Sequence, residues 1–450
     1  MDDAATPRTA DPASPGMPSA RRYVVASVVG NALEWYDFFL YATAASIVFG
    51  QLFFPAVGDP LIATLASLAG LTVGFLARPF GGVVFGHIGD RFSRRSALVA
   101  TLCMMGVATF LIGLLPTYAT AGAWAPVLLV ALRVVQGVAA GGEWGGAVLM
   151  ISENVPAERR GFLSAWSQAG LALGFVLSSG VFLLTQLSMG EQAFLDWGWR
   201  IPFLISLAIV GVGAYIRFRI PTDQVGSESA HGAGRPRLPV VEVVRTHRRS
   251  LLLAMALRIA ENGGAYIFLT FALAYGAHVG VPQELLLLGV MLSMTFAVGS
   301  MLLFGHLSDR IGRRPVYSGG ALGLAVLAFP FFWMLDTTAP ALVLLAFFLG
   351  NGVCHAAMIG VQPAYFTELF SPEVRYSGLS LAHELAAVLA GGLSPLIATA
   401  LLAATGSSVP IALYVIGLAA ITLIALLVSR HWSHGETTRP APTAAAEDAR

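Results

Sequence analysis

The sequence contains no lysine, so arginine carries all 26 of the side-chain positive charges. Charged residues make up only 11% of its 450 residues, against about 25% in soluble domains. Hydrophobic residues make up 56% of the chain, which is more than one soluble core would bury. A lipid bilayer is therefore the expected solvent of most of this surface.

Cysteine is also scarce. Cys103 and Cys354 each lie inside an apolar run, which indicates small core residues rather than a disulfide or a metal site. The histidines lack the spacing of metal ligands, and no nucleophile elbow or phosphate loop is present. A net charge of +1 leaves no basic face for nucleic acid. We therefore predict no enzyme activity, no metal, no cofactor and no nucleic-acid partner.

Against this apolar background, one charged sequence occurs twice. Residues 86–95 read GHIGDRFSRR, and residues 305–314 read GHLSDRIGRR, 219 residues later (305 minus 86). Two glutamates and an arginine also recur with the same spacing, at Glu153, Glu158 and Arg160 and again at Glu368, Glu373 and Arg375. The chain is therefore predicted to contain two copies of one unit of about 200 residues. Such repeats build many transporters, with a site between the halves.

Apolar runs long enough to cross a bilayer alternate with short polar or Pro/Gly turns. They predict twelve transmembrane helices, at 23–50, 61–85, 97–116, 124–151, 161–187, 201–219, 250–278, 285–305, 316–335, 340–368, 377–403 and 409–429. The polar stretch 220–249 is expected to link the halves. The expected fold is thus an all-α membrane protein of two six-helix bundles, at 21–219 and 250–430. Residues 1–20 and 431–450 are predicted to be disordered tails.

The arginines are distributed unevenly between the turns. They gather before the first run, after the second, fourth, eighth and tenth runs, and in the linker. The alternate turns carry almost none, with Arg200 as the exception. By the positive-inside rule, this pattern predicts a multi-pass protein of the cell inner (plasma) membrane with both termini in the cytoplasm.

Ionisable residues inside the apolar runs are costly and are therefore candidates for function. An arginine can bind a carboxylate through two N–H groups, and a buried acid or histidine can carry a proton. The candidate substrate-binding residues are Arg133, Arg258, Tyr41, Gln136, Asn262, Asn351, Gln362 and Arg78. The candidate proton-coupling residues are Glu34, Asp37, Glu143, Glu261, His355, His383 and Glu384.

A structural role is the alternative for these buried charges. Glu34 or Asp37 would then pair with Arg133, and Glu261 would pair with Arg258, as simple ion pairs. Gly263 and Gly264, which follow directly, are expected to loosen their helix at mid-depth.

The duplicated loops lie at the predicted cytoplasmic ends of the helices. Gly86 and Gly305 would allow close helix approach, and Asp90 and Asp309 can cap a helix or pair with an arginine. We interpret these loops and the second repeated set as a gate that closes the inner side. Its predicted members are Asp90, Arg91, Arg95, Glu153, Arg160, Asp309, Arg310, Arg314, Glu368 and Arg375. The alternative is that the arginine clusters only set topology.

Several of these motifs resemble a known family. The paired G-x-x-x-D-R-x-x-R-R loops and Arg133-x-x-Gln136-Gly137 resemble signatures of the major facilitator superfamily. Residues 30–38 (GNALEWYDF), 141–147 (GGEWGGA) and 375–378 (RYSG) resemble its metabolite:proton symporter family. The first loop departs from the pattern, since Ser93 stands where the second loop has Gly312.

The resemblance covers about residues 22–430 and implies import of a metabolite with protons. The family's substrates are organic acids, shikimate-like compounds and dicarboxylates, or zwitterions such as proline and betaine. Residues 258–262 (RIAEN) resemble the shikimate- and organic-acid-type members. The short tail after 430 has no heptads, unlike the coiled coil of osmosensing proline/betaine members, which disfavours that branch.

We therefore predict a secondary transporter that imports a small organic anion with protons by alternating access, as a monomer in the bilayer. A zwitterion substrate and an exporter driven by proton antiport are the alternatives within transport. A non-transporting membrane sensor for the same ligand is the alternative from another class. A sensor would normally need a soluble signalling appendage, which neither tail supplies.

Overall fold

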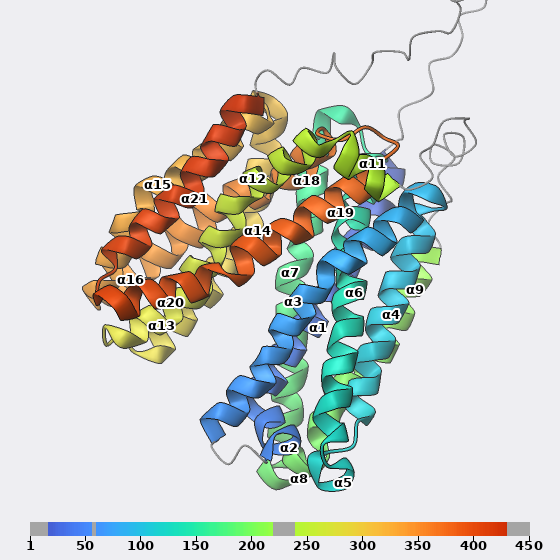
Figure 1. Ribbon diagram of the computed structural model, residues 1–450, viewed down its shortest axis with the longest axis vertical. Helices are drawn as coiled ribbons and strands as arrows, with labels where there is room; N and C mark the ends of the chain where they lie inside the picture. Colours follow the sequence, from blue (N-terminus) through green and yellow to red (C-terminus); the bar gives the residue numbers. More distant parts are fainter. Residues whose placement is uncertain (1–16, 56–59, 219–238, 430–450) are drawn as a thin grey trace, which may run out of the picture.

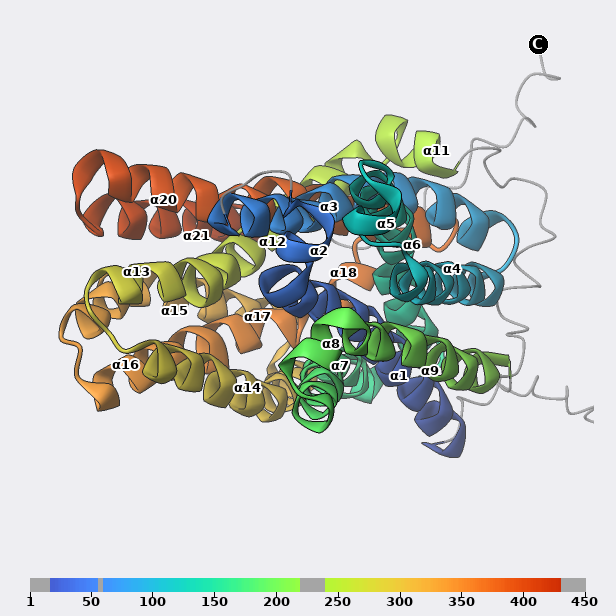
Figure 2. The same ribbon diagram turned by 90° about the horizontal axis from the view of Figure 1, so that it is seen from below.

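The computed structural model describes residues 17–55, 60–218 and 239–429. Figure 1 shows two groups of long helices, the first running from α1 to α9 and the second from α12 to α21. The groups cross at the end where α11 lies, which we call the linker end, and diverge toward the opposite end. Seen from below in Figure 2, the second group lies to the left of the first.

Each predicted run of the first half is a long helix. In chain order these are α1 (Met17–Ala44), α3 (Pro60–Arg91), α4 (Arg94–Leu114), α6 (Trp124–Ser152), α7 (Arg160–Met189) and α9 (Ile201–Phe218). A π-helical segment, η1 (Ala45–Phe49), extends α1 into α2 (Gly50–Phe53). The short helices α5 (Tyr118–Ala121) and α8 (Glu191–Asp196) lie in turns at the end opposite α11.

The second half has the same number of long helical segments, but three of them contain a π-helical stretch. The regular ones are α14 (Gln283–Ile311), α15 (Arg313–Asp336) and α21 (Val409–Val428). The first interrupted one joins α12 (Arg248–Ala265), η6 (Tyr266–Phe271) and α13 (Ala272–His278), and the second joins α16 (Pro340–Phe347), η7 (Phe348–His355), α17 (Ala356–Ile359) and α18 (Gln362–Thr367). The third joins α19 (Arg375–Ala386), η8 (Ala387–Gly392) and α20 (Ser394–Thr405). The irregularity expected at Gly263 and Gly264 is thus a π-helical segment that begins at Tyr266. In the described part of the chain, eleven helices are long and apolar enough to cross a membrane. Helix α1 is not one of these eleven, since it is more polar and carries Glu34 and Asp37.

The two copies of the repeated loop turn in different ways. Gly312 has φ +95°, a conformation that favours glycine, and α15 begins directly after it. Ser93 instead has an extended backbone, and its hydroxyl accepts a hydrogen bond from the N–H of Ser96 at 3.4 Å. The serine is therefore the N-cap of α4. The second loop turns through a glycine with positive φ, whereas the first turns through a serine that caps the next helix.

Two predicted boundaries were wrong. Helix α1 begins at Met17, inside the predicted tail, because Pro18 is tolerated in a first helical turn. The predicted linker contains a helix, α11 (Pro239–Arg245), and α12 starts at Arg248. Pro239 and Val243 of α11 are buried because the helix packs against α3 and α19. The rest of the linker and the ends of both tails lie outside the described residues, so the domain limits stay a prediction.

Glycine allows helices of the two groups to approach closely at the linker end. Helix α3 packs on α19, and α14 packs on α7. A Cβ atom on Gly86 would lie 2.8 Å from Cα of Ser377, and one on Gly305 would lie 2.7 Å from Cβ of Ala165. Both are closer than side chains normally approach, so only glycine fits at these crossings.

Candidate functional site

A partly open pocket lies in the first helix group. Helices α1, α3, α4 and α6 surround it. Its wall contains Glu34, Asp37, Phe38, Leu71, Gly74, Phe75, Arg78, Met105, Arg133, Gln136, Gly137 and Ala140. The structure therefore brings five of the predicted site residues of the first half to one cavity, two acids, two arginines and an amide.

Arg78 links the two groups at this pocket. Its Nη2 donates to Oε1 of Glu34 at 2.6 Å, and its Nε donates to Oε2 of Glu384 at 2.8 Å. Glu34 comes from the first group and Glu384 from the second, and both are buried. Arg78 was predicted to bind substrate. Because two of its nitrogens already hold carboxylates, its geometry favours a bridge between the groups.

Arg133 is held in place by its own helix group. Its guanidinium lies over the ring of Tyr41, 4.0 Å from the centroid, and its Nη1 donates to Oε1 of Gln136 at 2.8 Å. The hydroxyl of Tyr41 donates to the carbonyl of Ser67 at 3.0 Å. Tyr41 therefore packs its ring against the guanidinium of Arg133 and does not line the pocket. No ion pair joins Arg133 to Glu34 or to Asp37 within the described structure, so that structural alternative was wrong.

Threonines on α4 contact two of the candidate acids. The hydroxyl of Thr109 lies 2.6 Å from Oδ2 of Asp37 and accepts a hydrogen bond from Nε2 of Gln136 at 2.6 Å. Two helical turns away, the hydroxyl of Thr101 donates to Oε2 of Glu143 at 2.7 Å. The sequence reasoning missed both threonines, although each is a polar residue inside an apolar run.

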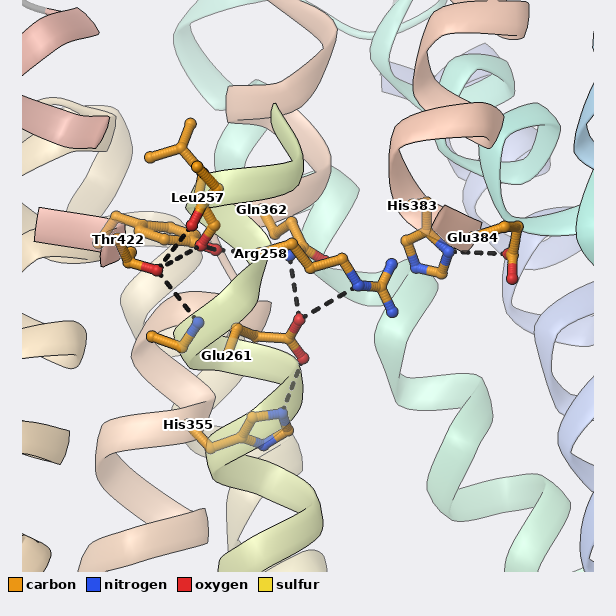
Figure 3. Close-up of polar contacts among 11 residues, drawn as sticks. Leu257, Arg258, Glu261, His355, Gln362, His383, Glu384 and Thr422 are labelled. Atoms are coloured by element: carbon orange, nitrogen blue, oxygen red, sulfur yellow. Dashed lines mark hydrogen bonds and ion pairs between the residues drawn. The ribbon is translucent and has the colours of Figure 1, made fainter. Parts of the chain in front are cut away.

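The second group contains a separate polar cluster (Figure 3) around Glu261. Its Oε1 lies 3.0 Å from Nε2 of His355, and its Oε2 accepts a hydrogen bond from Nε2 of Gln362 at 3.2 Å. Nε of Arg258 lies 3.6 Å from Oε2, which makes an ion pair but is too long for a hydrogen bond. The expected pairing of Glu261 with Arg258 is therefore present but loose.

Two side chains in this cluster have buried atoms without hydrogen-bond partners. Within the described residues, Nε and Nη1 of Arg258 have none, and neither has Oδ1 of Asn262. The side chains are only 6% and 7% exposed, so leaving these atoms unpaired is costly. Because residues four apart lie on the same face of a helix, one ligand can reach both side chains.

Aromatic contacts connect this cluster to the first group. The ring of His383 stacks on Trp144, with centroids 3.9 Å apart, and the guanidinium carbon of Arg258 lies 5.9 Å from the Trp144 centroid. Figure 3 shows Arg258 extending toward His383 and Glu384. Nδ1 of His383 lies 2.9 Å from Oε1 of Glu384, whose other oxygen is held by Arg78. The buried charges of the two groups thus converge, and Trp144 of the first group, which the sequence reasoning did not select, contacts His383 and Arg258 of the second.

The two repeated loops make matching contacts at the linker end. The carboxylate of Asp90 accepts hydrogen bonds from the backbone N–H groups of Tyr376 at 3.1 Å and Ser377 at 2.8 Å, at the start of α19. The carboxylate of Asp309 accepts them from Gly161 and Phe162, both at 2.8 Å, at the start of α7. Each aspartate therefore caps a helix of the opposite group, where unpaired N–H groups and the helix dipole favour an anion.

Of the three arginines in these contacts, the sequence reasoning selected Arg375 but neither Arg94 nor Arg313. Arg313 donates to Oδ1 of Asp309 at 2.6 Å and lies 3.5 Å from Glu368. In the other loop, Arg94 pairs with Glu153, which also accepts a hydrogen bond from Nη1 of Arg375 at 3.1 Å. Arg94 and Arg313 are the first of each arginine pair, four residues after the aspartate. Each is the first residue of the helix that follows the aspartate's own helix, just past the turn.

The remaining predicted gate arginines occupy other positions. Arg314 donates to the carbonyl of Ser429 within its own group, and Arg310 is exposed. Arg91 is exposed, with its guanidinium 5.7 Å from the ring of Phe92, and Arg95 is partly buried. Arg160 is partly buried near Glu368, with its Nε unpaired. Selecting Arg310 and Arg314 in place of Arg313 was therefore wrong, because adjacent helical residues point in different directions.

A family model described as Major Facilitator Superfamily matches residues 28–382 and 291–449. The chain belongs to the major facilitator superfamily. This result confirms the predicted fold class and shows that the chain is a multi-pass membrane transporter and not an enzyme.

Curated relatives of this facilitator chain carry metabolite-transport names. The "Shikimate transporter" of Escherichia coli (strain K12) is 40% identical over 405 residues, covering 89% of this chain and 92% of that protein. The "Inner membrane metabolite transport protein YhjE" of the same strain is 37% identical and covers 92% and 95%. The "Proline/betaine transporter" of Salmonella typhimurium (strain LT2) is 36% identical and covers 90% and 82%. The recognition of the metabolite:proton symporter family is thereby confirmed.

Solved structures share the facilitator fold. A double-tryptophan mutant of XylE matches with a TM-score of 0.75 over 91% of this chain and 95% of that one, at 18% identity. A partially occluded, inward-open form of the xylose transporter XylE from E. coli matches with a TM-score of 0.60 at the same identity, over 92% and 98%. At this identity, the likeness supports the fold and no finer conclusion.

Proposed function

We propose that the protein imports a small organic carboxylate, of shikimate type or a simple mono- or dicarboxylate, together with protons. The observation that carries the proposal is the buried guanidinium of Arg258, whose Nε and Nη1 have no hydrogen-bond partner within the described residues. Unpaired N–H groups of a guanidinium are strong, charge-assisted donors to a carboxylate. The 40% identity to a protein named for shikimate transport supports the same substrate class.

Polar side chains from both helix groups are available to such a ligand. In the second group, Asn262 lies one helical turn from Arg258 and shares its face. In the first group, Arg133 lines the pocket, and a Cβ on Gly74 would lie 3.0 Å from its Nη2, so glycine leaves room beside this nitrogen. A substrate held between the two groups would stabilise the state in which both contact it, which is the basis of alternating access.

Proton coupling is proposed because acids share the site with these permanent cations. Glu34, Glu384 and Glu261 are buried within reach of Arg78 or Arg258. Taking up a proton when the site opens outward and releasing it inward would use the proton gradient to drive uptake. Proton antiport by the same charged residues would instead export the substrate.

The linker end is proposed to be the cytoplasmic end and the gate. Asp90 and Asp309 join the two groups there through four backbone hydrogen bonds, so this form is closed on that side. The concentration of arginine at the same end supports a cytoplasmic location of both termini. We propose an inner (plasma) membrane location and a monomer as the working unit.

A zwitterion such as proline or betaine is the second candidate, favoured by the 36% identity to a proline/betaine transporter. Aromatic faces commonly bind quaternary ammonium groups. Here one face of Trp144 is covered by His383, and Arg258 lies near the same ring, so that platform is occupied. The contacts of Trp144 therefore favour the carboxylate over betaine.

Uptake by purified protein in liposomes tests the proposal. We expect radiolabelled shikimate, or another acid from a panel with succinate, proline and betaine, to accumulate with an inward proton gradient and to be lost with an uncoupler. Arg258→Ala should weaken uptake affinity by about 100-fold, since truncating one partner of a buried charged contact costs about 3 kcal/mol. Arg245→Ala, on the exposed face of α11, is the matched control. Betaine uptake that ignores Arg258 would refute the carboxylate proposal.

A further inference from the structure

A hydrogen-bond relay in the second helix group fixes the proton on one nitrogen of His355. The hydroxyl of Ser293 donates to the carbonyl of Val290 at 2.9 Å, so its oxygen accepts from Nδ2 of Asn351 at 3.3 Å. The amide oxygen of Asn351 is thereby turned toward Nδ1 of His355, 3.1 Å away. An amide oxygen only accepts hydrogen bonds, so Nδ1 must carry a proton.

The other nitrogen of the same ring meets an acid. Nε2 of His355 lies 3.0 Å from Oε1 of Glu261. With Nδ1 already protonated, a further proton must lie between these atoms, either on a charged histidine or on a neutral carboxyl. Without it, two lone pairs would face each other at hydrogen-bond distance. The pair therefore holds this further proton in this form, and losing it removes the hydrogen bond between Glu261 and His355.

Several polar and titratable side chains surround the pair. The other oxygen of Glu261 accepts from Gln362 at 3.2 Å and lies 3.6 Å from Arg258 on its own helix. From α15, the hydroxyl of Tyr317 donates to the carbonyl of Leu257 and accepts a bond from Gln362 at 3.4 Å. Tyr266, Tyr317 and Arg258 are the other titratable or charged groups that act on Glu261.

We propose that the Glu261–His355 pair carries the transported proton, with Asn351 and Ser293 as positioning residues that fix the histidine tautomer. This inference rests on the proposed function and deepens it, since seven buried acids and histidines were candidates for the role. Asn351 and Gln362, predicted to bind substrate, act here through Glu261 and His355.

The other candidates do not require an extra proton. Nδ1 of His383 lies 2.9 Å from Glu384, but Nε2 of His383 has no partner in the described chain that fixes its tautomer. A neutral His383 can therefore donate from Nδ1 to an ionised Glu384, which Arg78 also neutralises. Glu34 is likewise bound by Arg78. Asp37 and Glu143 each meet a threonine hydroxyl, which can donate to an ionised carboxylate.

The proton and the substrate would be coupled through Arg258. When a substrate carboxylate binds its free N–H groups, the positive charge that favours ionised Glu261 is neutralised, so the pair keeps its proton. Loss of the proton opens the contact between α12 and η7. His355 is the last residue of the π-helical segment η7, and Glu261 lies five residues before the start of η6. Such segments often mark functional sites in helices. Proton release is thus tied to movement of these helices.

Two transport readouts with shikimate as the probe test the assignment. Full-length variants in liposomes are assayed for accumulation under a proton gradient and for exchange without one. With one proton per substrate, a gradient of one pH unit gives the wild type about tenfold accumulation. Glu261→Gln and Asn351→Leu should lose this accumulation and keep exchange. Asn351→Asp, which still accepts from Nδ1, should retain it. His383→Gln should stay dependent on the gradient even if it is slower.

Accumulation by Asn351→Leu at the wild-type level would overturn the proposal. Nitrogen NMR of histidine-labelled protein gives a readout that needs no substrate, with the His355 signal assigned from His355→Gln. We expect a protonated Nδ1 in the wild type and a shift to the other tautomer in Asn351→Leu. A wild-type Nδ1 without a proton would refute the relay. Absence of shikimate transport alone would refute the substrate proposal while the NMR result still decides the tautomer.

Discussion

Removing the carboxylate of Asp90 should open the linker end. Asp90 accepts two backbone hydrogen bonds from the start of α19, across the interface between the helix groups. A hydrogen bond to a charged group contributes about 1.5–3 kcal/mol, and an acid at a helix N-terminus adds about 0.3–1 kcal/mol. Allowing for water that replaces these bonds, Asp90→Ala should cost the closed form about 3 kcal/mol, or about 100-fold in its population relative to the open form.

Spin-label distances can measure this change directly. Labels at Glu158 and Glu373, which are both exposed, report on opposite helix groups at the linker end. Both native cysteines, Cys103 and Cys354, would be replaced by serine first. We expect a single short distance in the parent protein and a dominant longer distance in Asp90→Ala.

Two comparison variants sharpen this measurement. Asp309→Ala removes the matching contact with α7 and should shift the distances in the same direction. Asp196→Ala removes an exposed acid at the opposite end and should change nothing. An unchanged distance distribution in folded Asp90→Ala would refute the view that this aspartate holds the linker end closed.

Three further substitutions have defined outcomes. Gly89→Ala would force a Cβ into the ring of Tyr376 and should open the linker end in the same spin-label assay; a closed distribution would contradict it. Thr422→Val removes the hydroxyl that donates to the carbonyl of Ala256 at 2.9 Å and accepts from the N–H of Ala260 at 3.1 Å, and should lower the thermal unfolding temperature through a loss of about 1 kcal/mol, whereas Thr422→Ser should not. Arg78→Gln leaves two buried carboxylates without their cation and should abolish shikimate exchange in liposomes, so normal exchange would disprove the bridge.

Hydrophobic run length predicted the helices well because the bilayer demands it. The departures lie at the ends. Helix α3 continues to Arg91 and α14 to Ile311, past the last apolar residue of each predicted run, because a helix can leave the membrane and continue in water. Beside Gly263 and Gly264 a loosened helix was expected, but no π-helical segment was predicted, since a shift in hydrogen bonding within a helix leaves no change in hydrophobicity.

The partners of the buried charges could not be predicted. Glu34 pairs with Arg78 rather than Arg133 because the crossing of α1 and α3 decides which side chains meet, and sequence spacing carries no such information. Neutral contacts were missed for a related reason. Thr109 and Trp144 carry no charge, so a search for costly buried ions passes over them, yet both contact candidate site residues. For the gate, the four-residue spacing from Asp309 to Arg313 was a usable signal.

The reciprocal capping by Asp90 and Asp309 places two cross-group contacts near the ends of α3 and α14. Helix α14 has 29 residues and is about 43 Å long, so its end lies about 20 Å from its middle. A tilt of about 10° about that midpoint would swing the end by about 3.5 Å, which more than doubles a 2.8 Å contact. In the proposed gate, a small tilt of the helices is therefore enough to break the contacts of both aspartates.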